Sequence, residues 1–386
     1  PFWLKIFGSR RNPGCPPLLR AMMVQHGSSK ARVTGGLVAC VLALGIATRA
    51  TASTSWISVF EWLLEFEDLA ATLSITLLSS LGVLVLLGEL RGIVFDPLWH
   101  FFLRPPTSFY RFQGDWAVVT GASRGLGRGY ALGLAKRGLN VVVVARNKEA
   151  LEVVAKECEE LGVKALVLVA DFTEDPETLY PQIRQHLDAL DGCISVLVNN
   201  VGGRPEGDVR APMPCYCEEI DYGTYDVFFK FNTAPAICMT HLLLQGMVHR
   251  QKGYILNVSS MNGLQACPYL SPYSAAKAYL SSYSACLRNE LRGRGSGVYV
   301  DVVCPGPVAT DGIKRAGMPC KAIPDPIVFA DKSLSLAKSS FAEVPWARHW
   351  WSMQFHGPHS HFLSKGATES RLYQAMDYSK FLGPLH

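Results

Sequence analysis

Short apolar runs recur through the middle of the chain, separated by longer stretches whose apolar positions follow a helical period. Six runs have the length and residue types of strands, at residues 116–119, 140–145, 165–170, 195–200, 254–260 and 298–303. The run at 140–145 is continuous and β-branched, which suits a parallel strand covered on both faces. This alternation predicts an α/β fold, a Rossmann-type doubly wound parallel sheet, over residues 113–338.

A longer apolar run precedes this domain. Residues 69–88 contain no charged side chain, and a helix of twenty residues spans about 30 Å, the thickness of the hydrocarbon core of a bilayer. Acidic side chains lie between residues 61 and 68, whereas Arg91, Arg104 and Arg111 follow the run. We therefore predict a transmembrane helix with the following domain on the cytosolic side, the alternative being a buried core helix.

The remaining segments are assigned from composition. Residues 1–68 form a basic leader, residues 89–112 a linker, and residues 339–386 a tail that lies on the substrate side or against the membrane. Within the leader, residues 33–48 form a second apolar run that includes three glycines. It is a first membrane span, a signal-like segment or a re-entrant piece.

Charge is distributed unevenly. The 386 residues carry a net charge of +5 and are 49% hydrophobic, with a mean hydropathy of +0.15. Residues 1–60 hold seven basic and no acidic side chains, so the rest of the chain has a net charge of −2. This pattern excludes a disordered chain and predicts a membrane rather than a nucleic acid as partner. The leader suits the endoplasmic reticulum membrane, with a mitochondrial transit segment as the alternative.

The eleven cysteines include no Cys-x-x-Cys pair, which predicts reduced thiols rather than a disulfide framework. Cys215 and Cys217, and the histidines at 356, 359 and 361, lack a second ligand pair at a recognisable spacing. We therefore predict no metal site.

A glycine-rich turn follows the first predicted strand and opens a helix. Gly121 permits the tight turn, Gly125 lets the backbone approach a pyrophosphate, and Gly127 permits close packing. Phosphates then lie at the helix N-terminus, where free N–H groups and the helix dipole favour anions. The pattern predicts a dinucleotide site.

The residues at the end of the second strand indicate which dinucleotide the site binds. Arg146 stands where an acidic residue would bind the ribose hydroxyls of NAD, and Arg124 lies in the glycine turn, so a 2′-phosphate would meet positive charge. This favours NADP(H), unless Arg146 only solvates a loop. Asp171, after the third strand, is placed to accept a hydrogen bond from the adenine amino group.

Ser260, Tyr273 and Lys277 form the candidate catalytic set. Tyr273 and Lys277 are four residues apart, which puts the phenol and the ammonium on one face of a helix. The ammonium is expected to lower the proton affinity of the tyrosine, as an acid–base catalyst requires. Ser260 ends the preceding strand, so the sheet edge brings it to the same point.

The chain also contains Thr-Gly-x-x-x-Gly-x-Gly from Thr120, the sequence Asn-Asn-Val-Gly from Asn199, and Pro305-Gly306. Together with the candidate catalytic set, these motifs have the order and spacing of the short-chain dehydrogenase/reductase family, which the chain therefore resembles. Between residues 116 and 310 the chain resembles the microsomal branch with very-long-chain 3-ketoacyl-CoA reductases and 17β-hydroxysteroid dehydrogenases. Arg124 replaces an acidic residue associated with that branch, and the tail after Phe341 does not match.

The resemblance implies a catalytic tetrad. Tyr273 would protonate the substrate carbonyl, Lys277 would hold the nicotinamide ribose and tune Tyr273, and Ser260 would hydrogen-bond the carbonyl. Asn232 would bend its helix around a proton-relaying water. The residues expected to bind NADP(H) are Thr120, Gly121, Ser123, Arg124, Gly125, Leu126, Gly127, Arg146, Asp171, Asn199, Asn200, Gly202, Tyr273, Lys277, Pro305, Gly306, Val308 and Thr310.

The expected function is that of a membrane-anchored NADPH-dependent ketoreductase acting on a long lipophilic ketone. The substrate is a 3-ketoacyl-CoA of fatty acid elongation or a 17-ketosteroid. Two alternatives stay open: a retinoid or sterol oxidoreductase, and a non-catalytic membrane scaffold that retains the fold. The resemblance implies pairing through the two long helices, which the apolar content of residues 275–291 suits, so a homodimer is expected.

Overall fold

The computed structural model describes residues 56–203, 216–264, 267, 269–315, 323–338 and 344–346. The chain divides into two compact units, Pro1–Val85 and Leu86–His386, each of which is described by itself. The apolar run at 33–48, and nearly all of the tail after residue 339, lie outside the described residues.

The predicted membrane segment lies within one long helix, α4, Trp56–Leu90. The helix begins earlier than predicted because residues 56–68 contain neither Gly nor Pro to end it. Within it, Ala71–Gly88 has a mean hydropathy of 2.0, and none of this window is buried. A second helix, α9 (Tyr222–His249), is also long and apolar enough to span a membrane, but 44% of it is buried in the domain, as in a core helix.

Six parallel strands form the sheet of the second unit, in the order β3-β2-β1-β4-β5-β6. They are β1 (Trp116–Thr120), β2 (Asn140–Ala145), β3 (Ala165–Val169), β4 (Ile194–Asn199), β5 (Gly253–Val258) and β6 (Val298–Val303). The doubly wound parallel sheet predicted from the sequence is confirmed, with each strand within two residues of its predicted run.

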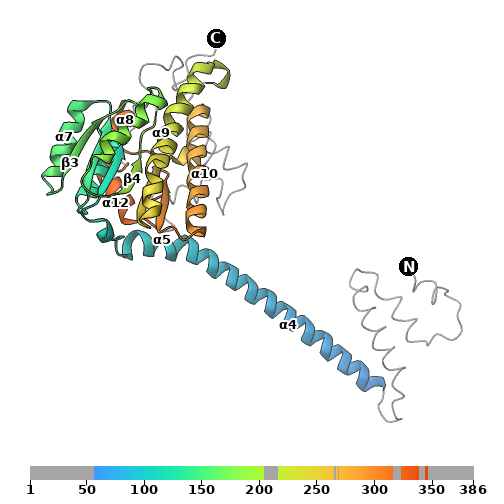
Figure 1. Ribbon diagram of the computed structural model, residues 1–386. Coiled ribbons are helices and arrows are strands. Elements are labelled where there is room, and N and C mark those ends of the chain that lie inside the picture. The colour runs from blue at the N-terminus through green and yellow to red at the C-terminus, as the bar shows by residue number, and fades with distance from the viewer. Residues whose placement is uncertain are drawn as a thin grey trace. The chain divides into compact units, whose positions relative to one another are not determined.

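Helices cover both faces of the sheet (Figure 1). One face packs against α6 (Gly125–Ala135), α7 (Lys148–Glu159) and α12 (Pro326–Ser335), whose buried residues share a core with the sheet. The other packs against α8 (Pro176–Asp188), α9 and α10 (Ser271–Gly293). Strand β1 is buried along its whole length, as is β2 after Asn140, which explains their continuous apolar sequences.

The predicted linker at 89–112 is largely helical and is held against the domain. It contains η1 (Arg91–Phe95), α5 (Asp96–Leu98), η2 (Trp99–Leu103) and η3 (Tyr110–Phe112). Lys332 Nζ donates to the Phe101 carbonyl at 2.6 Å, and Thr107 donates through its N–H to Ser335 O and through its hydroxyl to Ala337 O, each at 2.7 Å. Further along the chain, η4 (Cys217–Glu219), η5 (Met261–Gly263) and α11 (Asp311–Arg315) are short.

Candidate active site

Strand order reverses between β1 and β4, where the chain leaves neighbouring strands toward opposite faces of the sheet. The carboxyl ends of parallel strands at such a point form a crevice where α/β proteins bind ligands. The glycine turn follows β1, the Asn-Asn-Val-Gly segment follows β4, and Ser260 follows β5. The fold therefore brings the sequence-predicted segments to one edge.

The glycine turn is built as the sequence predicts. Gly121 and Gly125 have positive φ angles of +65° and +56°, which other residues rarely adopt. A Cβ on Gly127 would overlap the Gly121 carbonyl oxygen, and one on Gly125 would lie 3.2 Å from the Thr310 methyl group. Any side chain at Gly125 or Gly127 would therefore keep the N-terminus of α6 from lying this close to the turn.

Thr120 and Asn200 fix the turn to β4. The Thr120 hydroxyl accepts hydrogen bonds from the backbone N–H groups of Asn200 (3.0 Å) and Val201 (3.2 Å). Asn200 Nδ2 donates to the carbonyl oxygens of Thr120 (3.1 Å) and Gly121 (3.2 Å). Both side chains thus hold the backbone of the cleft in place.

The side chain of Asn199 is buried between β5 and α9 rather than lining the cleft as expected. Its Nδ2 donates to Asn257 Oδ1 at 2.8 Å, to Thr240 Oγ1 at 3.0 Å and to Ala236 O at 3.2 Å. The expectation failed because strand alternation turns this side chain under the sheet edge. Its role is to position β4 against α9.

Ser260, Tyr273 and Lys277 lie together at the ends of β5 and α10. The Ser260 side chain accepts from the Asn262 N–H at 3.2 Å, capping η5, and is hydrogen-bonded to the Tyr273 hydroxyl. Lys277 Nζ donates to the Val258 carbonyl at 3.0 Å and lies 5.9 Å from the centroid of the Tyr273 ring. The serine and the helical pair predicted from spacing therefore converge.

Two residues that sequence reasoning missed fix α10 in this position. The Ser259 hydroxyl donates to the Lys277 carbonyl oxygen at 2.7 Å and lies 2.8 Å from the Ser281 hydroxyl. A Cβ on Gly263 would lie 2.6 Å from the Lys277 carbonyl carbon, so η5 packs directly on the α10 backbone. The serine pair at 259–260 is the available signal, but the apolar pattern places Ser259 in the strand, which ends at Val258.

Burial determines the proton affinities of Tyr273 and Lys277. It raises the pKa of Tyr273, and the hydrogen bond from Ser260 offsets only part of that rise. Burial lowers the pKa of Lys277 to about 8. The expected lowering of the Tyr273 pKa by Lys277 is therefore wrong for this structure, because the desolvation of the phenol outweighs its polar contacts.

Asn232 joins the set through Gly202 and Gly203. Asn232 Oδ1 accepts from the Gly203 N–H at 2.7 Å, and its Nδ2 donates to Gly203 O at 2.9 Å and to Phe228 O at 3.0 Å. A Cβ on Gly202 would lie 2.7 Å from Lys277 Nζ and 2.8 Å from Asn232 Oδ1. All four residues of the expected tetrad thus border one small volume.

Arg146 and Asp171, predicted to choose and bind the cofactor, lie beside each other after β2 and β3. Arg146 Nη1 is 3.7 Å from Asp171 Oδ2. Asp171 Oδ1 accepts from the backbone N–H (2.9 Å) and hydroxyl (2.8 Å) of Thr173. The Asp171 carboxylate is thus already engaged, and the Arg146 side chain is 44% exposed at the edge.

The loop from Pro305 to Thr310 closes on the glycine turn. The Pro305 carbonyl accepts from the Met261 N–H at 2.9 Å, and Val308 is buried. Gly306 continues this loop, and the Thr310 methyl group contacts Gly125 as described. On the other side, Ser123 and Arg124 lie in the turn and Leu126 packs on the core beneath α6.

These features fit a dinucleotide. Arg124, the N-cap residue of α6, makes no side-chain cap hydrogen bond, which suits an anion at the first N–H groups of this helix. Glycines keep side chains out of the turn above them. From Arg146 past the turn to Lys277, this edge of the sheet thus offers a positive end, an anion site and a buried hydrogen-bond donor.

A family model described as short chain dehydrogenase matches residues 115–318. The chain belongs to this family. Its members are oxidoreductases that act on CH–OH or C=O groups. In the part of the chain that the structure describes, no group of three or more His, Cys, Asp or Glu could hold a metal ion.

Several curated relatives are similar over the domain. The chain is 43% identical to a very-long-chain 3-oxoacyl-CoA reductase of Anas platyrhynchos over 201 residues, 51% of this chain and 61% of the relative. It is 34% identical to a 17-beta-hydroxysteroid dehydrogenase type 3 of Danio rerio over 61% of this chain and 74% of the relative. An inactive hydroxysteroid dehydrogenase-like protein 1 of Pongo abelii is 38% identical over 58% of this chain and 65% of the relative.

Solved structures share the fold. A 7beta-hydroxysteroid dehydrogenase aligns with a TM-score of 0.58 at 21% identity, covering 69% of this chain and 99% of the other. A 3-oxoacyl (acyl-carrier-protein) reductase from Agrobacterium tumefaciens with NADP bound aligns with a TM-score of 0.52 at 21% identity, covering 61% and 92%.

Proposed function

We propose that this chain is an NADPH-dependent ketoreductase, anchored in the endoplasmic reticulum membrane with its catalytic domain in the cytosol. Its substrate is a long lipophilic ketone, a 3-ketoacyl-CoA of fatty acid elongation or a 17-ketosteroid. The observation that carries the proposal is the convergence of Ser260, Tyr273 and Lys277 beside the glycine turn.

The chain's own residues divide the work on the carbonyl group. The Ser260 hydroxyl, which is hydrogen-bonded to Tyr273, orients the substrate's carbonyl oxygen toward the phenol. Tyr273 donates its proton to that oxygen as charge develops there. Because burial holds the Tyr273 pKa above its ordinary value, the phenol is protonated at neutral pH and ready to act as the acid for reduction.

The cofactor would supply the hydride for the carbonyl carbon. Lys277, buried beside Tyr273 and Gly202, is placed to donate to the nicotinamide ribose and to the phenol as it loses its proton. Asn232 clamps the Gly203 backbone and so shapes the wall of the same pocket. The N–H groups of α6 and Arg146 would hold the phosphates, with Arg146 favouring a 2′-phosphate.

The substrate class rests on the relatives' names and on the apolar helix. A very-long-chain 3-oxoacyl-CoA reductase and a 17-beta-hydroxysteroid dehydrogenase both act, by name, on lipophilic carbonyl compounds or alcohols. The uncharged Ala71–Gly88 window is long enough to cross a bilayer. A membrane anchor would keep such an enzyme near a substrate that partitions into lipid.

Turnover by the full chain in detergent or vesicles tests the proposal. NADPH oxidation is followed with 3-ketoacyl-CoAs, 17-ketosteroids and retinals. Tyr273→Phe is expected to lower turnover by roughly 10²–10⁴-fold or more, because the acid is lost, while cofactor binding survives. Equal turnover by Tyr273→Phe would refute the assigned role of the tyrosine.

The same experiment addresses a scaffold function, which the relative named as inactive keeps open. A scaffold would bind NADPH yet leave every ketone of the panel unchanged. The intact set of Asn232, Ser260, Tyr273 and Lys277 favours the enzyme.

A further inference from the structure

A stripe of large apolar side chains is exposed on the helical segment η1–α5–η2, residues 91–103. Phe95 is 64% and Phe102 70% exposed, and Leu98, Trp99 and Leu103 are exposed beside them. All five side chains lie in this one continuous helical segment, between residues 95 and 103. We call these five residues the juxtamembrane face.

The opposite side of this segment is fixed to the catalytic domain. Pro97 and Phe101 are buried, and Lys332 of α12 donates to the Phe101 carbonyl at 2.6 Å. The segment therefore cannot rotate to bury its exposed stripe without losing these contacts. The juxtamembrane face is turned away from the domain by the fold itself.

We propose that the juxtamembrane face inserts into the interfacial layer of the lipid bilayer, next to the point where the chain leaves the membrane. This inference rests on the membrane anchoring in the proposed function and adds a second contact, made by the catalytic unit. It assigns a role to a segment that the sequence indicated only as a linker.

Chain length argues for lipid as the occupant. Phe95 follows Gly88, the end of the apolar window, by seven residues. Even a fully extended chain of that length reaches only about 25 Å, and a helical one about 10 Å. Because the chain from Gly88 to Phe95 is helical, a spanning Ala71–Gly88 segment would hold the start of this face within about 10 Å of the end of the span.

Composition argues in the same direction. Trp concentrates at membrane–water interfaces, and Trp, Phe and Leu form the buried face of helices that lie in the interface. Trp99 and the two phenylalanines supply such rings, and the Arg91 side chain, 77% exposed and 3.4 Å from Asp96 Oδ1, adds a positive charge on the same segment. An exposed patch of this kind on a folded domain indicates a contact with another apolar phase.

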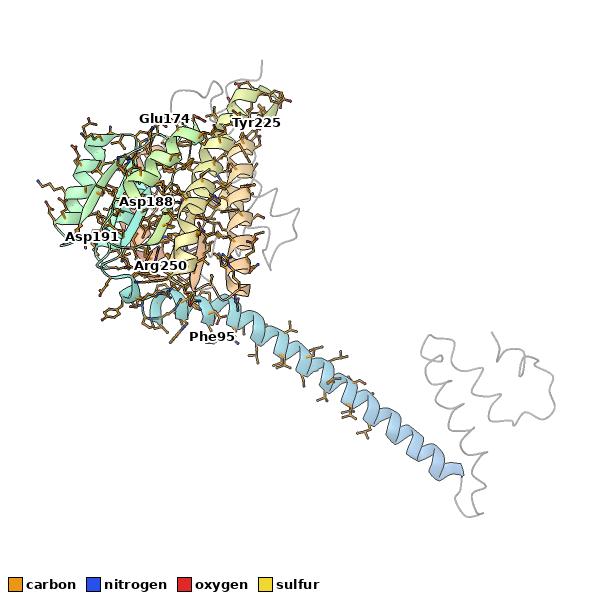
Figure 2. All side chains as sticks on the ribbon, viewed as in Figure 1. Phe95, Glu174, Asp188, Asp191, Tyr225 and Arg250 are labelled. Atoms are coloured by element: carbon orange, nitrogen blue, oxygen red, sulfur yellow. The ribbon has the colours of Figure 1, made fainter. Side chains whose placement is uncertain are left out.

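Docking at this face has a consequence for the catalytic edge. Figure 2 shows Phe95 at the end of the domain that carries Asp191 and Arg250, whereas Glu174 and Tyr225 lie at the other end. Asp191 and Arg250 precede β4 and β5, and Glu174 follows β3, so the catalytic edge is at the far end from the juxtamembrane face. The docked domain would hold the mouth of its site away from the bilayer, which suits a ketone carried on a polar group such as CoA.

Photo-cross-linking of the full chain tests the inference. The photoreactive amino acid p-benzoyl-phenylalanine replaces Phe102 in one variant, Leu81 of α4 in a second and Tyr222 in a third. Tyr222, 95% exposed near the catalytic edge, is the matched aromatic control, and Leu81 reports the span itself. Each purified variant is placed in vesicles of phosphatidylcholine and phosphatidylserine and illuminated.

Mass spectrometry then counts lipid adducts. Adducts are expected at positions 81 and 102, with a yield at 102 roughly tenfold or more above that at 222. Three results would each overturn the juxtamembrane contact while leaving the anchor intact. They are adducts at 81 without adducts at 102, a yield at 222 equal to that at 102, and cross-links from 102 to a second copy of the chain. Absence of adducts at both 81 and 102 would refute the anchor and this inference together. Ketone turnover by the same samples judges the catalytic proposal separately.

Discussion

At the scale of single residues, burial sets the proton affinities on which the site depends. Lys277 is 3% exposed, and burial lowers its pKa to about 8. Its Nζ donates to the Val258 carbonyl, and the nearby Cys304 thiol offsets only part of the lowering of its pKa. A ligand that accepts a hydrogen bond from Nζ would stabilise the ammonium, so ligand binding and protonation of Lys277 are coupled.

This coupling predicts a pH dependence of NADPH binding. Binding favours the protonated lysine, so affinity is full below pH 8 and is lost as the pH rises above the pKa of the free protein, about 8. We expect a loss of roughly tenfold between about pH 7.5 and 9.5, measured by fluorescence titration. Lys277→Arg, which stays charged, should remove the dependence; the same pH profile in both proteins would show that another group is responsible.

The second residue-scale prediction concerns Arg146. Its side chain is 44% exposed and lies beside Asp171 just after β2, where the 2′-phosphate of NADPH would bind. Arg146→Ala should raise the KM for NADPH by roughly 10- to 100-fold, the worth of a charged hydrogen bond, and leave the KM for NADH unchanged. Steady-state kinetics with NADPH and with NADH measure the two KM values. An equal change in both would show that Arg146 does not discriminate between the cofactors.

At the scale of elements, α6 approaches α12 through glycines. A Cβ on Gly129 would lie 2.7 Å from the Pro326 carbonyl oxygen and 2.9 Å from Ala330 Cβ. A Cβ on Gly133 would lie 2.8 Å from Leu334 Cδ1 and 3.6 Å from Arg137 Nη1, each the far end of a side chain. Backbone cannot move aside as a leucine methyl group can, so the two glycines differ in what they permit.

This difference predicts opposite effects for the same substitution. Gly129→Ala should destabilise the domain by about 1–3 kcal/mol through overpacking. Gly133→Ala should be neutral or stabilising by up to about 1 kcal/mol, because alanine favours the helix and Leu334 can adjust. Urea unfolding of the two variants measures both, and equal destabilisation would mean that the helices do not pack as described.

The sequence predicted elements and motifs well where the signal is local. The valine run at 140–145 and the strand-turn-helix around Gly121 follow from residue types and spacing alone. The same holds for Tyr273 and Lys277 on one helix face. What escaped prediction depends on distant parts of the chain.

Three features show why. The Asn199 side chain turns to α9, forty residues further on, and the pKa of Tyr273 depends on how deeply it is buried. The predicted linker at 89–112 is ordered by Lys332 and Ser335, which lie more than two hundred residues later. No local pattern contains these contacts, because tertiary packing creates them.

At the scale of the whole molecule, the account requires α4 to hold the enzyme in a membrane. Leu77→Arg together with Leu81→Arg puts two charges near the centre of the apolar window, at a cost of about 5–7 kcal/mol. Alkaline carbonate should then extract most of the chain from microsomes. Leu90→Arg, at the end of α4, is the control and should stay in the pellet, since its charge can reach the headgroups. Equal extraction of all variants would argue against a span.

The central claim is that this chain reduces a ketone with NADPH and that Tyr273 supplies the proton. One measurement tests it directly. The full chain in vesicles is given a long-chain 3-ketoacyl-CoA and NADPH carrying deuterium at the transferred position, and the product is analysed by mass spectrometry. We predict one deuterium at the former carbonyl carbon, formed roughly 10²–10⁴-fold or more slowly by Tyr273→Phe. Hydroxyacyl product without deuterium, or deuterium transfer at equal rates by the two proteins, would contradict the account.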